Sequence, residues 1–322
     1  LLVLSSAVPV NVIVSIPVNN VISASISPAF TTSLPSLTGK ATKMNNLFEG
    51  CSNLETLEIG SSLKTIGIGA FDGCSHLQAI HIKDLKSWCE IQPESNISNS
   101  HKLYLNEDEL IDVMIPEGVT KVPYHAFSGC DSLRSIVVPN TVTNMDCGAF
   151  NGCSCLTNVV VPFVGCYPDG REWAEWYGDS KELSFGAIFC GDRYASEMTM
   201  ASCVPASLKH VSVTNDEEIP AGAFRWCNGI ESVTIRADAI GKGAFYPCLG
   251  LKSISICGSA TNIKESAFMG CEGMTRIDIP SSVIVIGDSA FGSCYGVEEL
   301  TIGDGVANIG GCAFAYNTHL KS

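Results

Sequence analysis

One stretch of the C-terminal third decides the fold: Ala267-Phe-Met-Gly-Cys-Glu-Gly-Met-Thr-Arg-Ile-Asp-Ile-Pro-Ser-Ser-Val-Ile-Val-Ile-Gly-Asp-Ser-Ala-Phe291. Ile277 and Ile279 stand two residues apart, which is the period of a short strand with one buried face. Pro280 has no N–H group and therefore ends the strand hydrogen bonding. Val283 and Ile286 then turn the chain inward again. The stretch predicts one coil that opens with a strand and closes on a buried small-large pair, Ala and Phe.

The closing Phe recurs along the chain, and each time a Cys follows it by three residues. From Phe48 to Phe314 the steps between successive Phe residues are 23, 56, 23, 74, 21, 23, 23 and 23. The eight pairs are Phe48/Cys51, Phe71/Cys74, Phe127/Cys130, Phe150/Cys153, Phe224/Cys227, Phe245/Cys248, Phe268/Cys271 and Phe291/Cys294. A fixed period of this length is typical of a solenoid. We expect these eight cysteines to be buried thiols that act as small hydrophobic groups.

No single coil can bury its own apolar side chains, so the coils must stack. Stacking pairs each strand in parallel with its neighbours and joins the inward side chains into continuous rows. The predicted fold is a β-rich repeat solenoid with short parallel strands and a 23-residue period, right-handed by the general rule for parallel crossovers. Residues 44–322 form the solenoid, with insertions near 83–104 and 163–204. Residues 1–43 depart from the pattern and are expected to form divergent N-terminal coils and an edge strand.

The consensus Ala-Phe-x-x-Cys-x-x-Leu-x-x-Ile-x-Ile-Pro-x-x-Val-x-x-Ile resembles the BspA-like leucine-rich repeats, also called the Treponema pallidum type. It fits Leu54-x-x-Leu57-x-Ile59, Leu133-x-x-Ile136-x-Val138, Leu251-x-x-Ile254-x-Ile256 and Val297-x-x-Leu300-x-Ile302. The resemblance covers roughly residues 44–322. It implies a leucine-rich-repeat scaffold, secreted or on a cell surface, that serves adhesion or protein–protein interaction.

Charge and motifs argue against several other functions. The 19 Lys and Arg residues against 33 Asp and Glu give a net charge of −14, which repels nucleic acid. No stretch approaches the roughly 18 consecutive apolar residues of a membrane span, so we expect no membrane insertion. The six histidines are scattered singly, and neither a phosphate-binding loop nor a nucleophile elbow occurs. The sequence predicts no enzyme, no cofactor and no metal site.

Aromatic residues concentrate in the second insertion, where they suggest a partner surface. Tyr167, Trp173, Trp176 and Tyr177 lie within eleven positions, and helical spacing would place the last three on one face. This face either folds down onto the solenoid as a satellite core or presents a binding patch for a protein or a glycan. The strand face of the coils, in contrast, carries small polar groups and Arg276 as its one anchor of the kind that dominates interfaces.

Four cysteines lie in or beside the second insertion and outside the repeated Phe–Cys frame. They are Cys155, Cys166, Cys190 and Cys203. In a secreted protein one pair among them could staple the insertion by a disulfide. The alternative is that all four are thiols.

The last coil has no visible polar cap. Phe314 ends the Phe series, Asn317 stands where the next Cys would be, and the strand that should follow Leu320 is missing. That strand needs apolar residues three and five positions after Leu320, and Leu1 and Val3 of a second copy would fall there. The alternative function is therefore a structural subunit that assembles head-to-tail with further copies into an extracellular filament. The other explanation is that the chain is an excerpt of a longer repeat protein.

Overall fold

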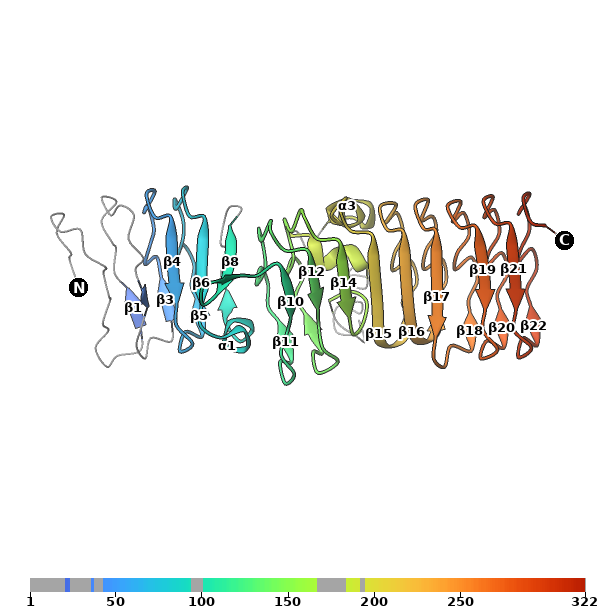
Figure 1. Cartoon of the computed structure of the whole chain (residues 1–322), viewed down its shortest axis with the longest axis horizontal. Coiled ribbons are helices and arrows are strands. Elements are labelled where there is room, and N and C mark those ends of the chain that lie inside the picture. Colours follow the sequence, from blue (N-terminus) through green and yellow to red (C-terminus); the bar gives the residue numbers. More distant parts are fainter. Residues whose placement is uncertain are drawn as a thin grey trace.

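The computed structural model describes residues 21–23, 36–37, 43–93, 101–166, 184–191 and 195–321. The described coils lie side by side along an elongated array, with strands β1 and β22 at its opposite ends (Figure 1). Each coil contributes a strand to one long side, here called the first row. Most coils contribute a shorter strand to a second row.

The first-row strands pair in parallel, and their register equals the repeat length. Leu57 lies beside Ile80, and Ile80 lies beside Leu103, a shift of 23 residues at each step. The strands of this row are β2 (Ser36–Leu37), β4 (Thr56–Ile59), β6 (Ala79–Ile82), β8 (Lys102–Leu105), β10 (Asp112–Met114), β12 (Ser135–Val137), β14 (Asn158–Val161), β15 (His210–Ile219), β16 (Ser232–Ile240), β17 (Ser253–Cys257), β19 (Arg276–Ile279) and β21 (Glu299–Ile302). The parallel-strand solenoid with a 23-residue period is confirmed.

The second row lies along the return path of each coil, after the turn that follows the first strand. Its strands are β1 (Val21–Ser23), β3 (Lys43–Asn45), β5 (Thr65–Ile66), β7 (Gln92–Pro93), β11 (Lys121–Val122), β13 (Asn144–Met145), β18 (Asn262–Ile263), β20 (Val285–Ile286) and β22 (Asn308–Ile309). Strands β15 and β16 are long enough to serve both rows, because β16 pairs with β17 near its start and with β18 at its end. The two strands described before residue 43 pair with strands of the solenoid, β1 with β3 and β2 with β4. The division at residue 43 stays a prediction.

A stack of phenylalanine rings runs through the interior. Neighbouring rings are nearly parallel in the C-terminal coils, and the centroid of Phe245 lies 4.7 Å from that of Phe224 and 4.9 Å from that of Phe268. Such offset-stacked pairs contribute free energy beyond the area that they bury. The Phe residues of the repeat therefore form a ladder in two runs, Phe48 with Phe71 and then Phe127 to Phe314. No coil can keep its own ring buried without its neighbours.

The eight repeated cysteines line this ladder and are all buried, as expected from their spacing. They also donate hydrogen bonds: Cys153 Sγ lies 3.0 Å from the carbonyl oxygen of Phe127, and Cys248 Sγ lies 2.8 Å from that of Phe224. In both cases the acceptor belongs to the preceding coil. Burial raises the pKa of Cys153 to about 12, so the thiol keeps its proton and remains a donor.

The first insertion is anchored to the solenoid by a short helix. Helix α1 (Leu85–Cys89) begins after Asp84, whose carboxylate accepts a hydrogen bond from the Ser87 N–H group. Trp88 is buried, and its indole N–H donates to the carbonyl of Ala126, 2.9 Å away. Strand β8, at the end of this insertion, pairs with β6 in the repeat register and then turns back through the antiparallel strand β9 (Asp108–Glu109).

The described part of the second insertion fills a place in the ladder. It contains the 3₁₀ helix η2 (Phe185–Phe189) and helix α3 (Glu197–Cys203). The ring of Phe189 lies 6.2 Å from that of Phe150, and the ring of Phe185 lies 4.8 Å from that of Phe224. The aromatic row therefore continues across the gap of 74 residues that separates Phe150 from Phe224 in the sequence.

Candidate interaction site

Six of the nine predicted site residues lie outside the described part of the chain. Tyr167, Trp173, Trp176 and Tyr177, the predicted partner patch, are among them, and so are Leu1 and Val3 of the predicted assembly edge. These predictions stay predictions.

The three other assembly residues lie in the last described coil. Phe314 stacks on Phe291 with ring centroids 5.5 Å apart, and Leu320 is exposed. Asn317 takes the place of the repeated Cys: its Nδ2 group donates to the carbonyl of Phe291 at 3.1 Å. Its Oδ1 atom also accepts from the N–H group of Cys294 at 2.9 Å. The asparagine thus continues the thiol row and adds a hydrogen bond that a cysteine could not make.

The four cysteines in or beside the second insertion form no disulfide in the structure. They are Cys155, Cys166, Cys190 and Cys203. Cys155 is exposed, Cys190 is buried and Cys203 is half-buried. Cys166 is buried with its sulfur 2.6 Å from the sulfur of Cys147. Cys147 was not among the residues from which the sequence predicted a staple.

The strand face offers no open cationic anchor at Arg276. Its Nε atom lies 2.7 Å from Asp278 Oδ2, and its Nη1 atom lies 3.0 Å from Glu299 Oε2. The hydrogen bond to Asp278 and the charges of both acids raise the pKa of Arg276 and keep it paired. This arrangement agrees with the expectation that the strand face is a poor surface for tight recognition.

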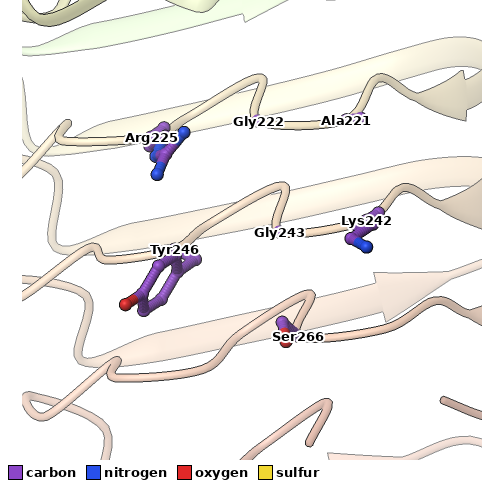
Figure 2. A pocket seen from close by; sticks show the side chains of 7 residues that line it. All are labelled: Ala221, Gly222, Arg225, Lys242, Gly243, Tyr246 and Ser266. Atoms are coloured by element: carbon purple, nitrogen blue, oxygen red, sulfur yellow. The ribbon is translucent and has the colours of Figure 1, made fainter. Parts of the chain in front are cut away.

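A hollow opens instead on the turns that follow the second row. It has a volume of about 410 Å³ and is built by three successive coils, as Figure 2 shows. We call it the cationic hollow; its lining residues are Ala221, Gly222, Arg225, Lys242, Gly243, Tyr246 and Ser266.

The guanidinium of Arg225 lies over two aromatic rings. Its Cζ atom lies 5.6 Å from the ring centroid of Trp226 and 5.8 Å from that of Tyr246. Trp226 is exposed and has a φ of 68°, and its N–H group donates to the carbonyl of Pro247 at 3.1 Å. Cation–π contacts of this kind orient a guanidinium against an aromatic ring.

A second cation and an open floor complete the hollow. Lys242 Nζ lies 2.9 Å from Glu265 Oε2, but both side chains are more than half exposed, and such surface pairs are weak. Gly222 has a φ of 67°, and a Cβ atom built there would meet nothing within 4 Å. The hollow therefore combines a stacked arginine, a lysine and two hydroxyl groups, those of Tyr246 and Ser266, around free space.

This set of groups suits a carboxylate. A guanidinium binds a carboxylate through two parallel N–H···O bonds, and an ammonium adds a second charge-assisted bond. The sequence did carry a signal for the site, since Arg225 and Tyr246 each directly follow a ladder Phe. In the described parts of the chain, no three His, Cys, Asp or Glu residues come together as a metal site. No described helix has the length and hydropathy needed to cross a membrane.

Several solved structures of bacterial leucine-rich repeat proteins are similar to this chain. A structure of a leucine-rich cell surface protein from Faecalibacterium prausnitzii is 25% identical, with 87% of this chain and 82% of that chain covered and a TM-score of 0.35. A leucine-rich repeat protein from Bacteroides ovatus is 19% identical over 87% and 81% of the two chains, with a TM-score of 0.34. The T. pallidum leucine-rich repeat protein is 19% identical over 70% and 82%, with a TM-score of 0.35.

No curated protein matches the chain. The model of the BspA type leucine rich repeat region matches residues 41–163 and 204–322 in six copies. These two ranges make up about three quarters of the sequence and contain the Phe–Cys coils described above. The chain belongs to the BspA-type leucine-rich repeat family.

Proposed function

We propose that this protein is a non-catalytic, extracellular scaffold on a cell surface, which adheres by binding a partner protein at the cationic hollow. The observation that carries the proposal is the half-buried Arg225, whose guanidinium lies over the ring of the exposed Trp226 and over that of Tyr246. Arg, Trp and Tyr are the residues that most often dominate the binding energy of protein interfaces. The partner would place an acidic side chain against Arg225.

The surroundings of the hollow support a protein partner. Leu249 is exposed and Pro247 is half-buried, both in the coil next to that of Trp226. The backbone N–H group of Leu249 donates a hydrogen bond to Asn228 Oδ1 at 3.0 Å, which ties the two coils together beside the hollow. An apolar rim beside a charged centre offers both burial and orientation to a partner. The long row of coils supplies a firm support for such a surface.

Selection from a phage-displayed library of random linear peptides tests this proposal. We expect the peptides retained by the protein to be enriched in Asp or Glu next to an aromatic or aliphatic residue. Their affinity, measured by biolayer interferometry, should fall at least tenfold for Arg225→Ala and for Tyr246→Ala. The matched control is Arg134→Ala, which removes one exposed arginine elsewhere on the solenoid and should leave binding unchanged.

Two results would contradict the proposal. One is that the selected peptides bind Arg225→Ala as well as they bind the unmodified protein. The other is that Trp176→Ala, in the predicted patch of Tyr167, Trp173, Trp176 and Tyr177, abolishes binding while Arg225→Ala does not. That second result would move the binding surface to the aromatic insertion.

A second candidate function, assembly of copies end to end into a filament, is favoured by the open face of the last described coil. Ile309 in β22 is 52% exposed, and Ile302 in β21 is also exposed. Each of these two strands has a described neighbour on one side, β20 and β19 respectively. Unpaired strand edges with exposed apolar side chains readily accept another strand. In this proposal Leu1 and Val3 of a second copy, or a further coil, would cover Leu320 and Phe314.

Negative-stain electron microscopy of the purified chain tests this second candidate. Filaments that disappear for Ile309→Glu and for a version without residues 1–16 would support head-to-tail assembly. The matched control is Ile284→Glu, which puts the same charge on an exposed residue of an inner coil. Isolated particles for the unmodified chain at high concentration would contradict the filament.

A further inference from the structure

Cys147 and Cys166 form a pair that the proposed function does not use. Their sulfur atoms lie 2.6 Å apart. Non-bonded heavy atoms normally settle about 3.5–4.0 Å apart, whereas the two sulfurs of a disulfide lie about 2.05 Å apart. The distance between the two sulfurs is therefore well below a non-bonded contact and nearer to the length of a disulfide bond.

Backbone contacts hold the two segments together independently of the sulfurs. Cys147 follows strand β13, and the N–H group of Met145 in that strand donates to the carbonyl of Cys166 at 2.9 Å. On the other side of Cys166, the N–H group of Val164 donates to Asp216 Oδ2 at 3.0 Å. The close approach of the two cysteines is thus built into the stacking of the coils.

The pair also differs from the repeated cysteines of the ladder. Each ladder thiol whose bond is described above donates to a phenylalanine carbonyl of the preceding coil. Cys147 and Cys166 have each other instead, and Cys147 keeps 8% of its surface exposed whereas Cys166 keeps 0%. A reagent that enters from solvent would therefore meet Cys147 before Cys166, and Cys166 is already placed to attack the Cys147 sulfur.

We propose that Cys147 and Cys166 are oxidised to a disulfide that fastens the start of the second insertion to the neighbouring coil. The thiolate of Cys147 attacks one sulfur of a low-molecular-weight disulfide such as oxidised glutathione, and one glutathione thiolate leaves. Cys166 then attacks the Cys147 sulfur of the mixed disulfide and releases the second glutathione. The two protein thiols lose two electrons and two protons, and the glutathione disulfide is reduced to two thiols.

Counting thiols after oxidation tests the proposal. The protein is incubated in a buffer of oxidised and reduced glutathione, then unfolded and labelled with N-ethylmaleimide without reductant. We expect two fewer labels than in the fully reduced protein, together with a protease fragment in which Cys147 is joined to Cys166. Oxidation should also raise the urea midpoint of unfolding, because the cross-link restricts the unfolded chain.

Two variants sharpen the result. Cys166→Ser should carry the same number of labels with and without oxidation and should show no shift of the urea midpoint. Cys155→Ser removes an exposed cysteine of the same region and should behave like the unmodified protein. Equal label numbers in the oxidised and reduced unmodified protein would overturn the proposal, and so would a fragment that joins Cys166 to any other cysteine. Because the unmodified protein alone decides these outcomes, the test does not depend on the folding of either variant.

Discussion

The described part of the second insertion should be as important for stability as a coil of the repeat, and Phe185→Ala measures this directly. Phe185 is fully buried, and its ring lies 5.4 Å from Phe189 and 4.8 Å from Phe224. Its N–H group also donates to the carbonyl of Ala223 at 2.8 Å. Truncation of a buried Phe to Ala costs about 3–5 kcal/mol in well-packed cores. We expect Phe185→Ala to lower the free energy of unfolding by about 4 kcal/mol.

The assay is urea unfolding followed by circular dichroism, with hydrogen exchange read by mass spectrometry. In a solenoid each coil is stabilised mainly by its two neighbours. A weakened contact at η2 should therefore let the coils before the insertion unfold separately from the coils after it. The single unfolding transition should divide into two, and exchange should accelerate first in β14 and β15, on either side of the insertion. The control is Met198→Ala on helix α3, where the side chain is 62% exposed and the loss should stay below about 0.5 kcal/mol.

A loss below about 1 kcal/mol for Phe185→Ala, with one unbroken transition, would refute this reasoning. Such a result would mean that η2 covers the ladder from outside and that the two halves are joined through β14 and β15 alone. Phe185→Leu offers a graded check, because it keeps most of the buried volume and should cost clearly less than Phe185→Ala.

Three further outcomes follow from described contacts. Burial lowers the pKa of His125 from 6.5 to about 4; the unfolded chain therefore binds the proton first, and stability should fall by up to about 3 kcal/mol between pH 7 and pH 4. Urea midpoints across this range should show a smaller fall for His125→Asn, because asparagine tolerates the positive φ of 58° that His125 adopts. Gly186→Ala should cost about 1–3 kcal/mol, because its Cβ atom would clash with the backbone carbonyl of Met200. Gly229→Ala, whose nearest contact would lie at 4.0 Å, should leave the melting temperature unchanged. Asn317→Ala should destabilise by about 1–2 kcal/mol, and Asn317→Cys should lose less because it restores a donor; equal melting temperatures for the two would contradict the role of the amide.

The repeated part of the fold was predictable because the sequence of each repeat determines the structure of its coil. The alternation of Ile277 and Ile279, the Pro after them and the returning Phe and Cys determine the strand, the turn and the buried rows. What the spacing did not reveal was the donor role of the thiols, since a hydrogen bond from Cys248 to the carbonyl of Phe224 joins two coils. The same holds for Asn317, which looked like a break in the series and in fact continues it.

The insertions were harder to predict because their residues do not follow the 23-residue spacing of the repeat. Phe185 and Phe189 reach the ladder through a 3₁₀ turn that shares no spacing with the coils. Trp88 was visible as an aromatic residue, but its hydrogen bond to Ala126 depends on how the first insertion folds back. The cationic hollow is lined by residues of three coils, and Arg225 lies over the ring of Tyr246 from the next coil. The spacing within one repeat does not reveal such contacts.

The interruption of the first row beside β9 has a mechanical consequence. Strands β8 and β9 belong to one sheet and β10 begins another, so no described strand pairing carries load from one to the other on that side. The hydrogen bonds of His101 to Gly129 and of Trp88 to Ala126 cross the junction instead. If the protein were pulled along its length, as a tether between a cell and a surface would be, tension would concentrate at this junction. The protein would unfold first at this junction. The C-terminal coils, which carry the cationic hollow, would stay folded and bound to their partner.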